Sequence, residues 1–115
     1  MKISSQFKLV ALATLVLSVL PVSAQTAVNS VSISKIRTGW NADNFALETK
    51  ATPVVNPANC PVTDGYMSIG TSAGYKTFLT ASLTAFSSEK KVTIVVSDTE
   101  CVSSRPKIWG IYLEQ

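Results

Sequence analysis

Alternating apolar and polar positions predict a β-hairpin early in the chain. Residues 28–37 place valine and isoleucine on one face and serine on the other, as a half-buried strand does. The alternation slips by one position near Lys35, which predicts a β-bulge there. A turn rich in Gly, Asn and Asp spans residues 38–44, and a second alternating run covers residues 45–49. The two runs are therefore expected to pair as a hairpin.

A helical period appears over residues 73–88. Thr71 or Ser72 is expected to cap its first turn. Its polar face carries threonine and serine with a single lysine, where the exposed helix of a monomer usually carries glutamate, lysine and arginine, so this face is a candidate contact with another subunit. The predicted buried face consists of Tyr75, Phe78, Leu79, Ser82, Leu83 and Phe86, widened by Ala81 and Ala85.

Three further strands complete the predicted fold. They are expected over Tyr66–Ile69, over the β-branched run Val92–Val96 and over Ile108–Leu113. In the last strand, Trp109 and Ile111 are expected to face the core together. Five strands with one helix between the third and the fourth is the order of the OB-fold, so we expect a mainly β protein built as a five-stranded OB-like Greek-key barrel. A generic α+β sandwich with the same order of elements is the alternative.

Residues 1–24 have the composition of a secretory signal peptide. Two lysines precede an apolar run over residues 9–20, and Val-Ser-Ala at positions 22–24 supplies the small residues that a signal peptidase requires. These small residues place the expected cleavage before Gln25. Because the apolar run is shorter than the roughly 20 residues of a membrane span, we expect no integral membrane segment after cleavage. Residues 25–115 are then expected to form a single domain that is secreted or periplasmic.

The charge balance gives no sign of a nucleic-acid partner. The whole chain has ten basic and seven acidic residues, and two of its lysines lie within the predicted signal peptide. The remaining charges nearly cancel and are interspersed along the sequence. A nucleic-acid interface would need a basic stripe, so we expect no nucleic-acid binding.

Cys60 and Cys101 are the only cysteines, and the chain has no histidine. Two cysteines without histidine cannot build a standard structural zinc site, and an oxidising compartment favours a disulfide over free thiols. We therefore expect an intramolecular Cys60–Cys101 disulfide, with a free pair or an intermolecular bridge as the alternatives. Closing this loop is worth about 4 kcal/mol in the chain-entropy model.

The absence of histidine also limits the chemistry. It removes histidine acid–base catalysis and the Ser-His and Cys-His nucleophiles. The sequence has neither a glycine-rich phosphate loop nor a paired metal-ligand spacing. We therefore expect a protein that is not an enzyme and that carries no cofactor and no metal. A small hydrolase with an unfamiliar site is a distant alternative.

Trp40 is the best single candidate for binding. An aromatic side chain in an exposed turn stacks on sugars or fills a pocket of a partner. Arg37, beside the same turn, is placed to hold an anionic group. The alternative is that Trp40 folds back to cover one end of the barrel.

The order of elements and several stretches resemble the B subunits of bacterial AB5 toxins, especially those of the subtilase-cytotoxin and typhoid-toxin type. The resemblance lies in Ile33–Gly39 on the first strand, in the helix over Tyr75–Phe86 and in Lys91–Val96 directly after it. It implies an OB-fold, a ring-shaped homo-oligomer and the binding of host sialylated glycans. Those subunits place a glycan-contacting serine around the first strand, where this chain has Asn29 and Ser30.

The chain more closely resembles small uncharacterised secreted proteins of Gram-negative bacteria. The likeness is carried by residues 56–60 (NPANC) and by the ending over residues 106–114 (PKIWGIYLE), and it implies no activity. The first interpretation is therefore a secreted or periplasmic, non-enzymatic binding module similar to a toxin B subunit, with a glycan or a protein as its partner. The alternative is a monomeric envelope protein that binds or inhibits another protein.

Overall fold

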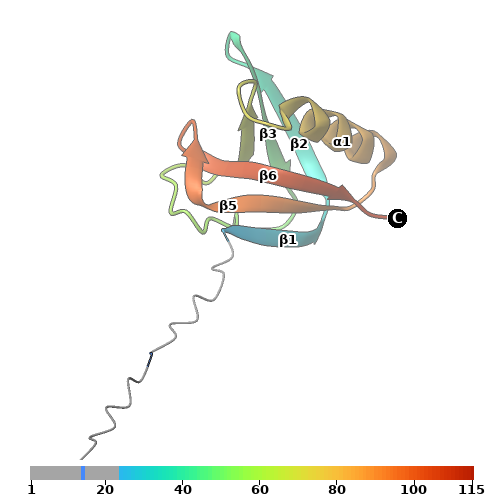
Figure 1. The fold of residues 1–115 in the computed structure, drawn as a ribbon. Helices are drawn as coiled ribbons and strands as arrows, with labels where there is room; N and C mark the ends of the chain where they lie inside the picture. Colours follow the sequence, from blue (N-terminus) through green and yellow to red (C-terminus); the bar gives the residue numbers. More distant parts are fainter. Residues whose placement is uncertain (1–13, 15–23) are drawn as a thin grey trace, which may run out of the picture.

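The computed structural model describes residue 14 and residues 24–115. The signal peptide predicted over residues 1–24 lies outside the described residues, except for Thr14 and Ala24. Along the chain, the elements are β1 (Gln25–Val31), β2 (Ile33–Gly39), β3 (Ala42–Thr49), β4 (Tyr66–Ile69), α1 (Tyr75–Ser88), β5 (Val92–Val102) and β6 (Arg105–Leu113), as Figure 1 shows.

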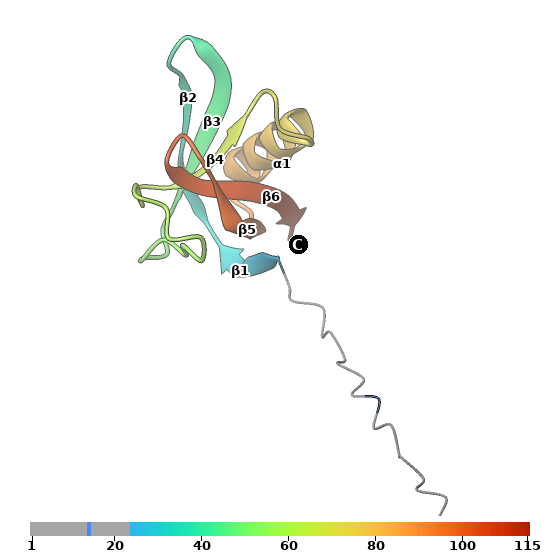
Figure 2. The same ribbon diagram turned by 60° about the vertical axis from the view of Figure 1, so that its left-hand side comes forward.

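The strands form one six-stranded sheet in the order β1-β5-β6-β4-β3-β2. Neighbouring strands are antiparallel except β4 and β6, which pair in parallel where Met67 meets Lys107. The sheet is strongly curved, and α1 packs against β6, β2 and β4 (Figure 2). The expectation of a mainly β fold with one helix is confirmed.

A five-stranded barrel is not found, because the first predicted strand is two strands. β1 pairs with β5 at one edge of the sheet and β2 pairs with β3 at the other, with only Ser32 between them. Ser30 has a left-handed backbone (φ 52°), and the register of β1 against β5 shifts between Val28 and Val31. This break redirects the chain from one edge to the other and leaves a six-stranded sheet that is not closed.

The hairpin predicted from the early alternation is confirmed as β2 and β3. Ile36 pairs with Leu47, and the register shifts between Ile33 and Lys35, as the slipped alternation predicts. The tip of this hairpin projects beyond the rest of the sheet (Figure 2). The third predicted strand, Tyr66–Ile69, has the predicted bounds as β4.

The core lies between the curved sheet and α1. β5 is buried without interruption from Val92 to Ser97, as its β-branched run favours. Tyr66 is 1% exposed, and its hydroxyl accepts a hydrogen bond from the Val55 N–H at 2.9 Å. This bond satisfies a buried polar group and ties the loop over residues 50–65 to the core. The largest fully buried apolar side chains are Tyr66, Phe45, Leu47, Ile94, Ile108, Val92 and Val96.

The helix α1 begins later than the sequence predicts. It starts at Tyr75, directly after Gly74, whose backbone is left-handed (φ 82°). No side chain caps this end, so the predicted cap by Thr71 or Ser72 is wrong. In the part of the chain that the structure describes, no helix is long and apolar enough to cross a membrane.

The buried face of α1 is rotated relative to the prediction. Ser82 and Ala85 are buried, whereas Leu83 and Phe86 are 47% and 44% exposed. The small side chains allow the helix to lie close to the sheet. The Ser82 hydroxyl donates a 2.6 Å hydrogen bond to the Phe78 carbonyl, so it is satisfied without water. Tyr75, Phe78 and Leu79 of the predicted face pack against the core, and only Leu83 and Phe86 lie on the exposed flank of the helix.

A bulge in β6 places Trp109 outside the core. Val95 pairs with Gly110 and Val96 with Ile108, so Trp109 falls between the two pairs. The extra residue reverses the alternation along the strand. Trp109 is therefore 46% exposed, while Ile108 is 1% exposed. The predicted core position of Trp109 is wrong.

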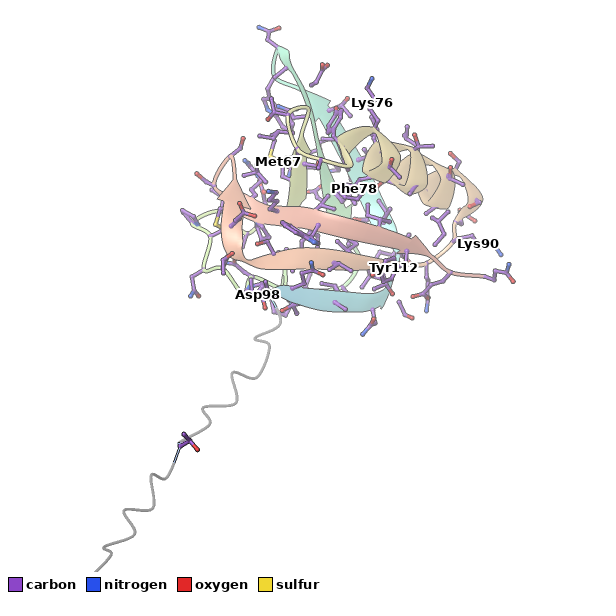
Figure 3. All side chains as sticks on the ribbon, in the orientation of Figure 1. Met67, Lys76, Phe78, Lys90, Asp98 and Tyr112 are labelled. Carbon is purple, nitrogen blue, oxygen red and sulfur yellow. A yellow bond between two sulfur atoms is a disulfide. The ribbon has the colours of Figure 1, made fainter. Side chains whose placement is uncertain are left out.

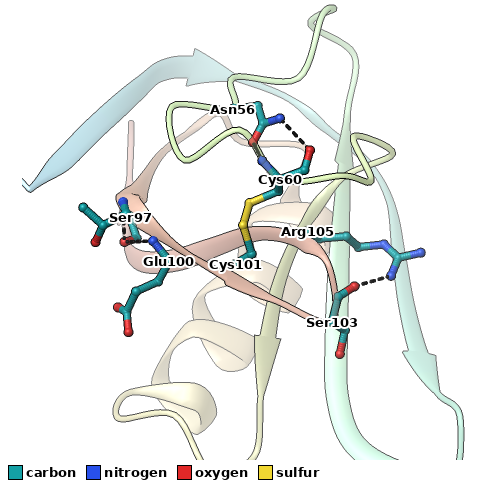
Figure 4. The surroundings of a disulfide bond; sticks show 8 residues. Asn56, Cys60, Ser97, Glu100, Cys101, Ser103 and Arg105 are labelled. Carbon is teal, nitrogen blue, oxygen red and sulfur yellow. Dashed lines mark hydrogen bonds between the residues drawn. A yellow bond between two sulfur atoms is a disulfide. The ribbon is translucent and has the colours of Figure 1, made fainter.

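The predicted disulfide is confirmed. Cys60 and Cys101 are bonded to each other, and the bond joins the loop over residues 50–65 to β5 (Figure 4). The Asn56 side chain closes the turn before Cys60. It accepts from the Cys60 N–H at 2.8 Å and donates to the Cys60 carbonyl at 3.0 Å. The loop is thus held by a covalent bond and by local hydrogen bonds.

Candidate functional site

Trp40 lies at the tip of the β2–β3 hairpin. It forms a two-residue turn with Asn41, and both residues have left-handed backbones, with φ of 61° and 58°. This pattern is typical of the type I′ turn, which favours asparagine and glycine, so a tryptophan is uncommon there. Trp40 is 56% exposed, so it does not fold back over the core.

The guanidinium of Arg37 connects Trp40 to the rest of the site. It lies over the Trp40 ring, 6.0 Å from the ring centroid, at the outer limit of a cation–π contact. Its Nη2 is 3.2 Å from the Asp64 carboxylate, and Nη1 donates a second bond to the same carboxylate at 3.2 Å. The predicted partnership of Arg37 and Trp40 is therefore present, with a carboxylate as a third member.

Asp64 also binds a second guanidinium. Arg105, the first residue of β6, donates from Nε to Asp64 at 2.6 Å and from Nη2 at 3.1 Å. Its Nη1 donates to the Ser103 carbonyl at 3.0 Å, which fixes the end of the β5–β6 turn (Figure 4). Hydrogen bonds from Arg105 and Arg37 hold the pKa of Asp64 far below its usual value. Two cations around one carboxylate leave the cluster with an excess positive charge.

Glycine at position 65 makes this cluster possible. A Cβ on Gly65 would lie 2.6 Å from the Leu47 carbonyl oxygen and 3.4 Å from Nη2 of Arg37. Only glycine allows the chain to pass this close to β3, and the close passage brings Asp64 beside Arg37. In the sheet, Arg37 is paired with Ala46, a buried residue that leaves room for the long side chain.

The other two predicted site residues, Asn29 and Ser30, lie elsewhere. They end β1, whereas Trp40 and Arg37 belong to the β2–β3 hairpin, and Figure 1 shows β1 at the bottom of the view and the turn of this hairpin at the top. The Ser30 hydroxyl donates to Glu114 at 2.9 Å, and the Thr93 hydroxyl donates to the same carboxylate at 2.7 Å. These bonds lower the pKa of Glu114. The four predicted residues therefore do not form one site.

A second exposed tryptophan was not expected from the sequence. Trp109 lies beside a groove of about 400 Å³ between the start of α1 and β6. The ammonium of Lys107 is 5.3 Å from the centroid of its ring, and Lys107 is paired with Glu100 at 3.2 Å. Only the β6 bulge turns Trp109 outward, and the sequence carries no clear signal for a bulge at that position.

The hairpin-tip cluster, defined as Trp40, Arg37, Asp64 and Arg105, offers recognition chemistry. It combines the exposed ring of Trp40 with the guanidinium groups of Arg37 and Arg105. Both guanidiniums are held in place by the Asp64 carboxylate, which is occupied by these bonds. Across residues 24–115, no three His, Cys, Asp or Glu side chains are grouped so that they could hold a metal ion.

No protein-family model, curated protein or solved structure matches the chain.

Proposed function

We propose that the chain is an exported, non-enzymatic binding module that takes a glycan at the hairpin-tip cluster. One observation carries this proposal. Asp64 binds both Arg37 and Arg105, which come from different ends of the sequence, and Arg37 lies over the ring of Trp40, which is 56% exposed. An exposed indole ring and pre-positioned donors are the two elements that recognition of a sugar requires.

The strand order supports this location for the site. If β1 and β2 are counted as one strand interrupted at Ser32, the order and the parallel β4–β6 pair correspond to an OB-like barrel. OB-folds bind oligosaccharides and oligonucleotides at the loop between their first two strands and at the loop between their last two. In this chain those loops contain Trp40 and Ser103, and Asp64 links them through Arg37 and Arg105.

The charge of the cluster favours a sugar that carries an acidic group. The ring of Trp40 provides a flat surface for the apolar face of a pyranose. The excess positive charge of the two guanidiniums around Asp64 would attract a carboxylate. This is the ligand class that the resemblance to toxin B subunits implies, so a sialylated host glycan is the specific form of the proposal.

A glycan array tests the proposal. The mature wild-type chain should bind a subset of acidic glycans, and Trp40→Ala should weaken that binding by at least about 2 kcal/mol, or roughly thirty-fold. The melting temperature should change little, since Trp40 is mostly exposed. Tyr112→Ala is the matched control, because Tyr112 is a 61% exposed aromatic on β6. Absence of binding to every glycan would overturn the proposal.

Export is proposed on the signal at residues 1–24 and on the disulfide. The Cys60–Cys101 bond fits an oxidising compartment, which is the periplasm or the exterior of the cell. The proposed activity needs no cofactor and no metal, because stacking and charge pairing are supplied by side chains of the chain itself.

A protein partner is the second candidate, and the flank of α1 favours it. Leu83 and Phe86 lie one turn apart on α1 and are 47% and 44% exposed, so this flank of the helix presents neighbouring large apolar side chains to solvent. In a ring-shaped homo-oligomer, the partner of this surface is another copy of the chain. In the alternative, the chain is a monomer and the surface binds a different envelope protein.

Size-exclusion chromatography with light scattering separates these two arrangements. A mass several times that of residues 25–115 supports the ring, and Leu83→Lys should then shift the mass toward that of the monomer. Thr80→Lys, on the exposed hydroxyl-rich face of the same helix, tests whether that face also belongs to the contact. A monomeric mass at every concentration supports the alternative.

A further inference from the structure

The groove beside Trp109 has the features of a small binding site. Its volume is about 400 Å³, within the usual range for small-molecule pockets. It is lined by Ala73, Gly74 and Phe78 at the start of α1 and by Lys107 and Ile108 on β6, and Lys107 contributes a polar group. Figure 3 shows Phe78 between α1 and β6, the two elements that border this groove.

Two local features of the backbone create the groove. The bulge between Ile108 and Gly110 turns Trp109 outward, and bulges commonly re-aim side chains next to binding sites. On the opposite wall, a Cβ on Gly74 would lie 2.5 Å from the Phe78 ring. Glycine at this position lets the Phe78 ring fold against the backbone, so that it lines the groove and does not fill it.

The charges around Trp109 favour a neutral ligand. The Lys107 ammonium lies 5.3 Å from the ring centroid, and its charge is balanced by Glu100 at 3.2 Å. This pair provides hydrogen-bond donors and acceptors without a net charge, in contrast to the positive hairpin-tip cluster. A neutral sugar ring matches this combination of a flat apolar surface and balanced polar groups.

We propose that the groove formed by Trp109, Phe78 and Lys107 is a second sugar-binding subsite that takes a neutral hexopyranose. The inference rests on the proposed function only in its choice of a sugar as the ligand class. The ring of the hexopyranose stacks on Trp109, and its hydroxyls bond to Lys107, whose charge is balanced by Glu100. The chain then contacts a glycan through two tryptophans of different selectivity.

The sequence makes this inference directly testable, because Trp40 and Trp109 are its only tryptophans. In Trp40→Phe all indole fluorescence comes from Trp109, and in Trp109→Phe all of it comes from Trp40. Each variant is titrated with methyl α-mannoside, methyl β-glucoside and methyl β-galactoside as neutral probes, and with glucuronic acid as the acidic probe. The Trp109 emission should change saturably with at least one neutral hexoside.

Two variants test whether the change in Trp109 fluorescence comes from binding in the groove. In the Trp40→Phe background, Lys107→Met should weaken binding of the responding hexoside by about tenfold, because it removes the polar group of the groove. Tyr112→Ala in the same background should leave the affinity unchanged, since Tyr112 does not line the groove. An equal loss for Tyr112→Ala would overturn the assignment to the groove.

The outcomes separate this inference from the proposed function. A Trp109 response to a neutral hexoside supports the inference, whatever Trp40 does. No Trp109 response, or a response to glucuronic acid alone, overturns it. A Trp40 response to glucuronic acid supports the hairpin-tip site independently. If neither the array nor the titration shows binding of an acidic sugar at Trp40, the result counts against the hairpin-tip site alone.

Discussion

Asp64 organises the hairpin tip at the scale of single residues. Its carboxylate binds guanidiniums from β2 and from the start of β6, and one of them lies over the Trp40 ring. Composition of the turn was enough to predict Trp40 and Arg37 as neighbours. Asp64 and Arg105 lie 41 positions apart along the chain, and no sequence pattern connects them. The close passage of the backbone at Gly65, which brings Asp64 beside Arg37, is likewise a feature of the folded chain alone.

The low pKa of Asp64 predicts a pH-dependent contribution to stability. Because the carboxyl is more acidic in the folded chain than the usual value of 3.8, its contribution is present at neutral pH and is lost as the pH falls below about 4. Asp64→Asn should lower the free energy of unfolding at pH 7 by about 1 kcal/mol, since the pair is partly exposed to solvent.

Urea unfolding of wild type and Asp64→Asn at several pH values measures this effect. The difference between the two curves should shrink progressively as the pH falls below about 4. Glu48→Gln, which removes the exposed ion pair of Lys35, is the control and should change little at any pH. A difference for Asp64→Asn that stays constant from pH 7 to pH 2 would contradict the assigned role of the carboxylate.

At the scale of elements, sequence periodicity predicted where the helix and strands lie better than which way they face. Residues 75–88 are helical and Ser82 is buried as expected, but Leu83 and Phe86 are exposed. The 3.6-residue period identifies an apolar side of a helix. It does not show which part of that side touches the sheet, because the width of the contact depends on neighbouring side chains. The bulge in β6 likewise interrupts the two-residue alternation of the strand, so the sequence predicts the wrong face for Trp109.

The rotation of α1 predicts unequal costs for two leucine truncations. Leu83→Ala should lower the free energy of unfolding of the monomer by less than about 1 kcal/mol, because the side chain is 47% exposed. Leu47→Ala should cost about 2–5 kcal/mol, because Leu47 is fully buried on β3 and its loss leaves a cavity. Chemical denaturation of both variants gives the comparison, and a larger loss for Leu83→Ala would show that the helix faces the core through a different side.

At the scale of the whole molecule, the class of fold was predictable and its closure was not. The two cysteines allowed one intramolecular pairing, and the strand-helix pattern indicated a mainly β chain with one helix. The predicted number of strands is wrong because the first predicted strand is interrupted at Ser32. A single alternating run gives no sign that its two halves pair with opposite edges of the sheet. The same break separates Asn29 and Ser30 from the hairpin tip, so the predicted site divides into two places.

The central claim is that a glycan binds at the hairpin tip. NMR chemical-shift mapping tests it most directly, using the mature chain and the glycan that gives the strongest signal on the array. The account predicts that the Trp40 indole N–H and the backbone amides of Arg37 and Asp64 shift during the titration, while those of Asn29 and Ser30 do not. Shifts confined to Asn29 and Ser30, with the hairpin tip unchanged, would contradict it.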